Sequence, residues 1–275
     1  MQIDAEIFSQ YLNHTRIFQI LFCSVLAVQL LLGFHRQLGY FQTTPARVYG
    51  PPPRLLGRLT LPTLTSGQFI LFGMVLIVSL VCAALSFVPR LFLALALLSY
   101  FLYFNPIMSL AYVQRKTNLI PLVLLVLLFA PGTGGPLTQE TPQWPLWLIK
   151  IGVAQMYFSA AVQKLRHAGW RWCNGRSLRA YLMDHYLWGD SELALKLARL
   201  PGVCMALSSV ILVFELTFFL ILLWPQLTLI YVVVGIAFHL STALTMRINY
   251  LKYLSPVYLV FVFDVERQLR AMWVG

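Results

Sequence analysis

Long runs of apolar residues constrain the fold of this chain more than any other feature of its sequence. A helix that crosses a bilayer needs about 20 consecutive, mostly apolar residues. Such runs recur along the chain, and 59% of its 275 residues are hydrophobic whereas only 11% are charged. This composition excludes an ordinary soluble domain. The sequence predicts an all-α, polytopic integral membrane protein, whose helical bundle forms a single transmembrane domain over residues 1–275.

The apolar runs predict about eight transmembrane helices, within a range of seven to nine. The fourth and the eighth are short for a span. We expect no cleavable signal peptide, because Asp4 and Glu6 lie where a basic segment is needed and the first run is too long. The predicted helices are 17–34, 69–88, 91–112, 119–131, 144–165, 203–224, 227–246 and 250–264.

The formal net charge of +11 is explained by membrane topology and not by a nucleic-acid partner, which we do not expect. Most of the Lys and Arg residues lie in four alternate connections, 35–68, 113–118, 164–202 and 247–252. The positive-inside rule places these connections in the cytoplasm and both termini outside it. Membrane lipids are the partners that this distribution predicts.

Motifs of the common hydrolases are absent from the sequence. It contains no GxSxG, no HExxH and no glycine-rich phosphate loop. It also contains no CxxC motif and no Cys/His cluster, so we expect no metal. A proton-transfer site, or a pocket for a small lipid-soluble ligand, remains.

Lys164 is the most informative polar residue of the predicted spans. A lysine within a membrane segment costs about 2.5–3.5 kcal/mol on insertion scales, so it either extends to the interface or serves a function. Lys150, Tyr157 and Lys164 recur every seven residues and therefore share nearly one helix face. A second polar stripe ends at Gln163. Two adjacent polar stripes are explained either by packing between helices or by a lined cavity.

Glu215 and His239 lie inside two further predicted spans, 203–224 and 227–246. An ionisable residue within the membrane is a functional-site hypothesis by default. The alternative is a protonated glutamic acid, or a histidine, that only bonds one helix to another. Lys164, Glu215 and His239 come from three different helices, and a shared site requires that they converge.

Two motifs resemble the membrane domain of the vitamin K-dependent gamma-glutamyl carboxylase. The first is the run from Tyr157 to Leu165, followed by Trp170, Gly175, Leu178, Tyr181 and Leu182. The second is Glu215, with Phe238 and His239 following 24 residues later. Over residues 10–265 the pattern is similar to that of the wider HTTM (horizontally transferred transmembrane) family, which includes bacterial proteins. A location in the bacterial inner (plasma) membrane is therefore expected.

The resemblance implies roles for individual residues. Lys164 would be the base that deprotonates a hydroquinone of the vitamin K or menaquinone type, with Glu215 and His239 as its catalytic partners. In the carboxylase the hydroquinone then reacts with oxygen to give a base strong enough to activate glutamate for addition of carbon dioxide. Tyr157, Gln163, Trp170 and Gly175 would bind the cofactor, and a peptide or protein is a possible substrate.

The sequence also departs from the carboxylase. Gln163 replaces the first lysine of the family's lysine pair, and Asn249 and Leu251 replace a glycine and a phenylalanine. We expect no counterpart of the carboxylase's large extramembrane region, so the resemblance does not imply carboxylation of glutamate. Two alternatives stay open: an HTTM protein that assists maturation or export of a secreted peptide, and a non-enzymatic quinone-binding or scaffold protein.

Overall fold

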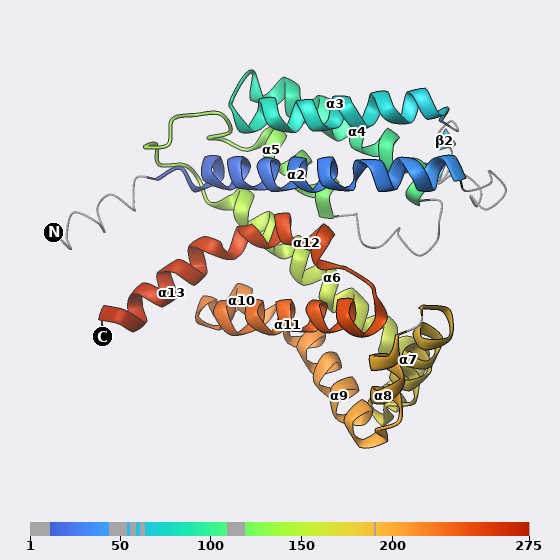
Figure 1. Cartoon of the computed structure of the whole chain (residues 1–275). Coiled ribbons are helices and arrows are strands. Elements are labelled where there is room, and N and C mark those ends of the chain that lie inside the picture. Colours follow the sequence, from blue (N-terminus) through green and yellow to red (C-terminus); the bar gives the residue numbers. More distant parts are fainter. Residues whose placement is uncertain are drawn as a thin grey trace. The chain divides into compact units, whose positions relative to one another are not determined.

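The computed structural model describes residues 12–43, 54–55, 59–60, 64–108, 119–189 and 191–274, and their regular structure is almost entirely helical (Figure 1). The exception is a pair of two-residue antiparallel strands, β1 (Arg54–Leu55) and β2 (Leu59–Thr60). The prediction of an all-α fold is confirmed. The chain divides into two compact units, Met1–Ile149 and Lys150–Gly275. The single domain remains a prediction. Asp4, Glu6 and the predicted connection 113–118 lie outside the described residues.

The first unit is built on a layer of packed helices. In it α3 packs against both α2 and α4, and α4 packs against α5 (Figure 1). The side chains of Arg16 and Gln19 on α2 donate hydrogen bonds to the last carbonyls of α3, at Ala84 (3.0 Å) and Ala83 (2.7 Å). These bonds satisfy carbonyls that a helix end leaves open, and a cation is favourable at that end. The helices are α2 (His14–Thr43), α3 (Ser66–Ala84), α4 (Pro89–Met108) and α5 (Leu119–Phe129).

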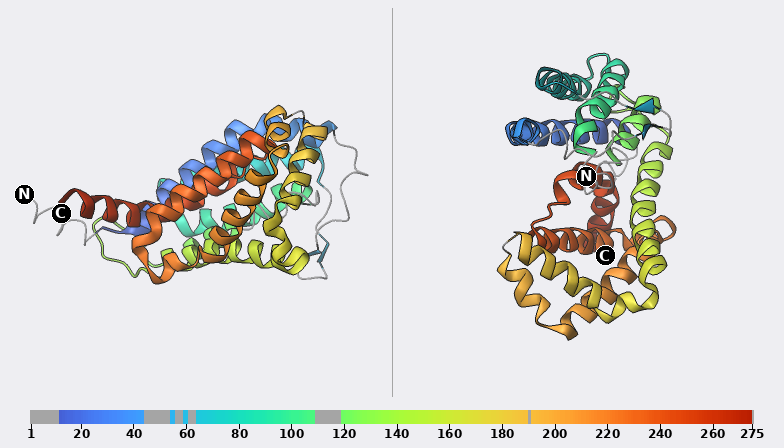
Figure 2. Two further views of the ribbon diagram at one scale, coloured as in Figure 1. Left: turned by 90° about the horizontal axis from the view of Figure 1, so that it is seen from below. Right: turned by 90° about the vertical axis from the view of Figure 1, so that its right-hand side faces the viewer.

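The second unit contains the predicted site residues. It is entered along α6 (Trp144–Ala168), a single continuous helix in the right-hand view of Figure 2. Apolar side chains of α7, α8 and the start of α9 form a small core around Leu182 and Cys204. After α6 come η1 (Gly169–Asn174), α7 (Arg176–Gly189), α8 (Glu192–Ala198), α9 (Pro201–Thr217), α10 (Leu220–Leu223), η2 (Pro225–Leu227), α11 (Thr228–Met246), α12 (Leu251–Tyr258), η3 (Leu259–Phe261) and α13 (Val262–Val274).

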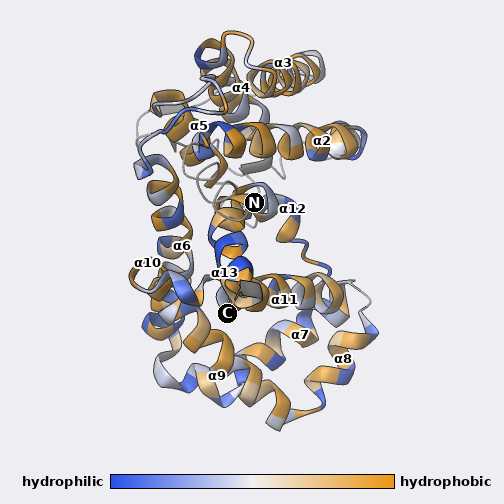
Figure 3. Cartoon of the chain, turned by 90° about the vertical axis from the view of Figure 1, so that its left-hand side faces the viewer, coloured by the Kyte–Doolittle hydropathy of each residue, from blue (hydrophilic) through white to orange (hydrophobic). Residues whose placement is uncertain are grey.

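Five helical segments of the described residues are long and apolar enough to cross a membrane. They are His14–Gly39, Ser66–Ala84, Trp144–Asn174, Pro201–Leu223 and Pro225–Met246. Figure 3 shows α3 and α9 as mostly hydrophobic, whereas α13 has hydrophilic turns. Two shorter apolar helices, Pro89–Phe104 and Leu119–Phe129, correspond to the third and fourth predicted spans. The chain is thus a membrane protein with several spanning helices, and the count of eight stays a prediction.

The eighth predicted helix, 250–264, is wrong as a single element. The structure divides it into α12, the short 3-10 turn η3 and the start of α13. Pro256 lies inside α12. A proline lacks the N–H that would bond four residues back, and its ring disfavours a continuous helix. The apolar pattern gave the correct residues but could not show this break.

Candidate functional site

The polar row on α6 contacts four other helices of the second unit. Lys150, Tyr157 and Lys164 lie on one face, as the seven-residue spacing predicts. Lys150 contacts α13, Tyr157 contacts α11 and α12, and Lys164 contacts α9. Each polar side chain of this row therefore meets a polar partner on a different helix.

Lys164 and Glu215 form an ion pair between α6 and α9. The ammonium of Lys164 donates to both carboxylate oxygens of Glu215, with a distance of 2.5 Å to Oε1. The Glu215 side chain is only 4% exposed, whereas that of Lys164 is 21% exposed. The Lys164 ammonium also lies 5.5 Å from the ring centre of Trp172, a cation–π distance. The lysine is therefore held by a carboxylate and an aromatic face, and it retains limited access from outside.

Tyr157, Tyr258 and His239 form a second polar group, which we call the hydroxyl cluster. The Tyr157 hydroxyl lies 2.6 Å from Nε2 of His239 and also bonds to the Tyr258 hydroxyl. All three side chains are buried. Within the described part of the chain, Nδ1 of His239 has no hydrogen-bond partner. A buried polar atom without a partner is unfavourable, so this nitrogen is available to bond to a further group.

Aromatic rings and one glycine shape the space around the hydroxyl cluster. The Tyr157 ring stacks on Phe218 at 4.4 Å between centroids and meets Phe214 edge-on at 5.2 Å. On α11, a Cβ at Gly235 would lie 2.8 Å from the Tyr258 hydroxyl and 3.4 Å from Phe214. Only glycine therefore allows α11 to approach these side chains without a shift.

A further ion pair joins the start of α6 to the start of α13. Nζ of Lys150 lies 2.5 Å from the carboxylate of Asp264, and both side chains are largely buried. Asp264 is in the first turn of α13, where a negative charge favours the helix. This ion pair joins α6 to α13, just as the Lys164–Glu215 pair joins α6 to α9.

Three predicted cofactor-binding residues lie outside these contacts. Trp170 is 75% exposed, and the indole that faces Lys164 belongs to Trp172. Gly175 is buried with φ of +75°, and a Cβ there would overlap the backbone of α9 at Met205, so the structure gives this glycine a packing role. Gln163 is half-buried on α6. Adjacent helix positions differ by about 100°, so Gln163 does not share the direction of Lys164.

Asp264, Tyr258 and Trp172 take part in the polar and cation–π contacts but were not predicted as site residues. Asp264 lies at the end of the predicted span 250–264, and nothing in the sequence predicts that it pairs with Lys150. Tyr258 had a usable signal, because a tyrosine inside an apolar segment needs a partner for its hydroxyl. Trp170 and Trp172 are close in sequence, and the family resemblance points to Trp170.

Comparison with protein families places the chain in a known group. A model of the HTTM domain matches residues 61–266, which is about three quarters of the sequence. The chain belongs to the HTTM family. The match includes the whole of the Lys164–Glu215 pair and the hydroxyl cluster, and the predicted resemblance to the HTTM family is confirmed. No curated protein and no solved structure matches this HTTM protein significantly.

Proposed function

We propose that this HTTM protein is a membrane-embedded enzyme in which Lys164 accepts a proton from a hydroquinone-type ligand of the membrane. The observation that carries the proposal is the Lys164–Glu215 pair on two apolar spanning helices. A charged pair within the membrane is expensive, and ionisable residues there usually serve a function. The Lys164 side chain is 21% exposed, so a ligand can approach this side chain from outside.

Glu215 would stabilise the product of the proton transfer. The ion pair corresponds to the state after the transfer, an ammonium ion next to the Glu215 carboxylate, so Lys164 would first release this proton and then take one from a ring hydroxyl. The attraction between the opposite charges of the pair is strong where water is scarce, which stabilises this product. Trp172 adds an aromatic face that favours the same cation. The three side chains thus support one chemical role, a base for a weakly acidic hydroxyl.

The hydroxyl cluster would bind or relay protons for the polar head of the ligand. Its hydrogen bonds connect Tyr258, Tyr157 and His239 and leave Nδ1 of His239 open. A hydroquinone oxygen would supply a partner for this nitrogen, since a ring hydroxyl both donates and accepts hydrogen bonds. Phe214 and Phe218 offer flat apolar contacts beside the cluster. In the carboxylase that the sequence resembles, the hydroquinone supplies the reaction with oxygen that produces a strong base.

The orientation and the location are proposed on separate grounds. We propose that both termini are extracytoplasmic, from the distribution of Lys and Arg, and that the membrane is a bacterial plasma membrane, because the HTTM family includes bacterial proteins. A peptide or another lipid-soluble molecule would be the group that is modified. Assistance in peptide maturation, and a non-enzymatic scaffold, are the rival functions, and in both of them Lys164 is a structural residue.

Purified protein in lipid nanodiscs tests the proposal with vitamin K hydroquinone and oxygen as reactants. Oxygen-dependent conversion of the hydroquinone to its epoxide is the readout. Loss of turnover in Lys164→Ala supports a base at Lys164 if that variant remains folded and Lys150→Ala, which also removes one ion pair, keeps its turnover. Turnover at the wild-type rate in Lys164→Ala would show that Lys164 is not the base and has a structural role.

A further inference from the structure

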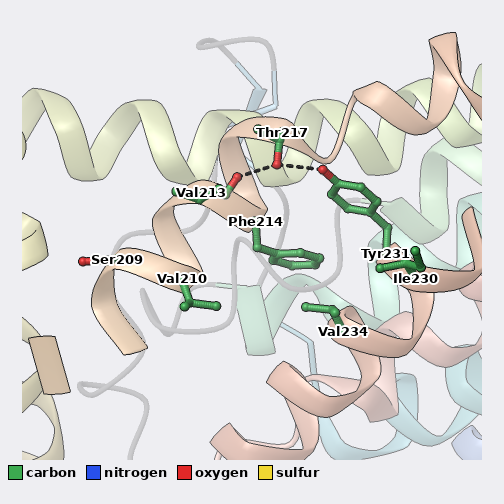
Figure 4. A pocket seen from close by; sticks show the side chains of 8 residues that line it. All are labelled: Ser209, Val210, Val213, Phe214, Thr217, Ile230, Tyr231 and Val234. Carbon is green, nitrogen blue, oxygen red and sulfur yellow. Dashed lines mark hydrogen bonds between the residues drawn. The ribbon is translucent and has the colours of Figure 1, made fainter. Parts of the chain in front are cut away.

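An open groove lies between α9 and α11, and Phe214 is the residue that it shares with the contacts described above (Figure 4). Its volume is about 420 Å³, within the range of about 300–1,000 Å³ that is usual for small-molecule sites. Its walls are Val210 and Val213 on α9 and Ile230 and Val234 on α11. The ring of Phe214 projects from α9 toward α11 across it (Figure 4).

The polar side chains on the groove wall already have partners. The Thr217 hydroxyl donates to the carbonyl of Val213 at 2.6 Å and accepts from the Tyr231 hydroxyl at 2.8 Å (Figure 4). Ser209 donates to the carbonyl of Met205 at 3.0 Å. These groups are therefore not directed at a ligand, and the groove favours an apolar occupant.

The groove is continuous with a surface that faces the membrane. Both helices belong to segments long and apolar enough to span it. Val210, Val213 and Ile230 are 58%, 59% and 60% exposed, which places their side chains against lipid in a bilayer. A hydrocarbon chain can enter this groove directly from the membrane without passing through water.

Only a thin layer lies between the groove and the hydroxyl cluster. Phe214 lines the groove, and its ring also meets the Tyr157 ring at 5.2 Å. Val234 lines the groove, and the next residue, Gly235, has no side chain to extend the wall. A Cβ at Gly235 would lie 2.8 Å from the Tyr258 hydroxyl and 3.6 Å from the Tyr157 hydroxyl. The Phe214 ring therefore separates an apolar groove from a buried polar group.

We propose that the groove holds the hydrocarbon tail of a ligand whose polar head passes Phe214 to reach the hydroxyl cluster. The inference rests on the proposed function, because it supplies the lateral entry and the tail site of the same hydroquinone-type ligand. In this arrangement Val213 and Ile230 bind the tail, and the head displaces the Phe214 side chain to reach the cluster.

Photo-crosslinking of the full chain in phosphatidylcholine nanodiscs tests the tail site. One probe is an alkyl hydroquinone with a diazirine in its tail, and the second is a phosphatidylcholine with a diazirine in one acyl chain. We expect the hydroquinone probe to label residues 209–217 and 230–234, and excess untagged alkyl hydroquinone to suppress the labelling. Val213→Trp and Ile230→Trp, which fill the groove, should weaken labelling about tenfold, the change that corresponds to 1.4 kcal/mol of binding.

Val233→Trp is the matched control, because Val233 is 55% exposed on α11 and does not line the groove. Its labelling should equal that of the wild type. Equal labelling by both probes without competition would show that bulk lipid fills the groove, and would overturn the inference. Labelling of Lys164→Ala as in the wild type separates the two proposals, since the tail site does not need the base. If the groove is not labelled but turnover still depends on Lys164, the tail site is rejected and the base is kept. If labelling is specific but turnover does not depend on Lys164, the base is rejected and the tail site is kept.

Discussion

Lys164 on α6 and Glu215 on α9 form a bidentate ion pair in which one ammonium donates to both carboxylate oxygens. The two residues are 51 positions apart in the sequence and lie in different spanning segments. The pair serves two purposes in our account. It fastens α6 to α9, and it holds an amine where a membrane-dissolved ligand can reach it.

The two members of this pair should be energetically coupled. Residues of one salt-bridge network usually show interaction energies of about 0.5–3 kcal/mol. We expect Lys164→Met to destabilise the protein more than the double variant Lys164→Met/Glu215→Gln, because the single variant leaves a buried carboxylate without its cation. Thermal unfolding in detergent, measured for the wild type, both single variants and the double variant, gives the coupling. Strictly additive changes would show that the two side chains do not interact.

Tyr258 should position Tyr157 through its hydroxyl. A hydrogen bond contributes about 1 kcal/mol on average, which corresponds to roughly a fivefold change in rate. We expect Tyr258→Phe to lower kcat by about this factor and to leave KM nearly unchanged, since the Tyr258 ring keeps its place against Phe261. Tyr231→Phe is the control, because its hydroxyl bonds to Thr217 and not to the cluster. Equal kinetic effects of the two substitutions would contradict a specific role for Tyr258.

Gly235 should be intolerant of a methyl group. A Cβ there would come within 2.8 Å of the Tyr258 hydroxyl, and overpacking of this kind costs about 1–3 kcal/mol. We expect Gly235→Ala to lower the melting temperature. At Gly202, also in the second unit, a Cβ would meet nothing within 4 Å, so Gly202→Ala should be neutral or slightly stabilising. An unchanged melting temperature in Gly235→Ala would mean that α11 does not approach the cluster so closely.

The sequence predicted the membrane class, most helices and the polar face of α6, because these depend on local periodicity. Seven-residue spacing put Lys150, Tyr157 and Lys164 on one face, and the structure keeps them there. Their partners could not be predicted, since contact between helices depends on how the helices pack. Glu215 and His239 were candidates, and the structure directs them to different members of that face.

Two differences between the sequence-based expectations and the structure have identifiable physical causes. Trp170 and Trp172 are two residues apart, and the 3-10 geometry of η1 determines which of them faces Lys164. A family pattern cannot resolve that difference. Pro256 signals a break within the segment 250–264, and the prediction of a single span from its apolar residues did not take this proline into account. The break leaves Tyr258 at the end of α12, where its hydroxyl reaches Tyr157.

The proposed orientation predicts the outcome of reporter fusions. If both termini are extracytoplasmic, alkaline phosphatase fused after residue 275 should be active, because this enzyme matures only outside the cytoplasm. A fusion within the basic connection 164–202 should be inactive, since the positive-inside rule keeps that connection in the cytoplasm. The reverse pattern of activity would invert the topology.

Chemical rescue of Lys164→Ala tests the central claim, that the Lys164 amine is a base, more directly than any other measurement. General base catalysis contributes about 10²–10⁴-fold to a rate, so the variant should lose at least about a hundredfold of hydroquinone turnover. Added methylamine should restore part of it, with an efficiency that depends on amine size and basicity, while Lys150→Ala keeps wild-type turnover without added amine. Turnover in Lys164→Ala equal to the wild type, or a loss that no amine restores while the protein stays folded, would contradict the assignment.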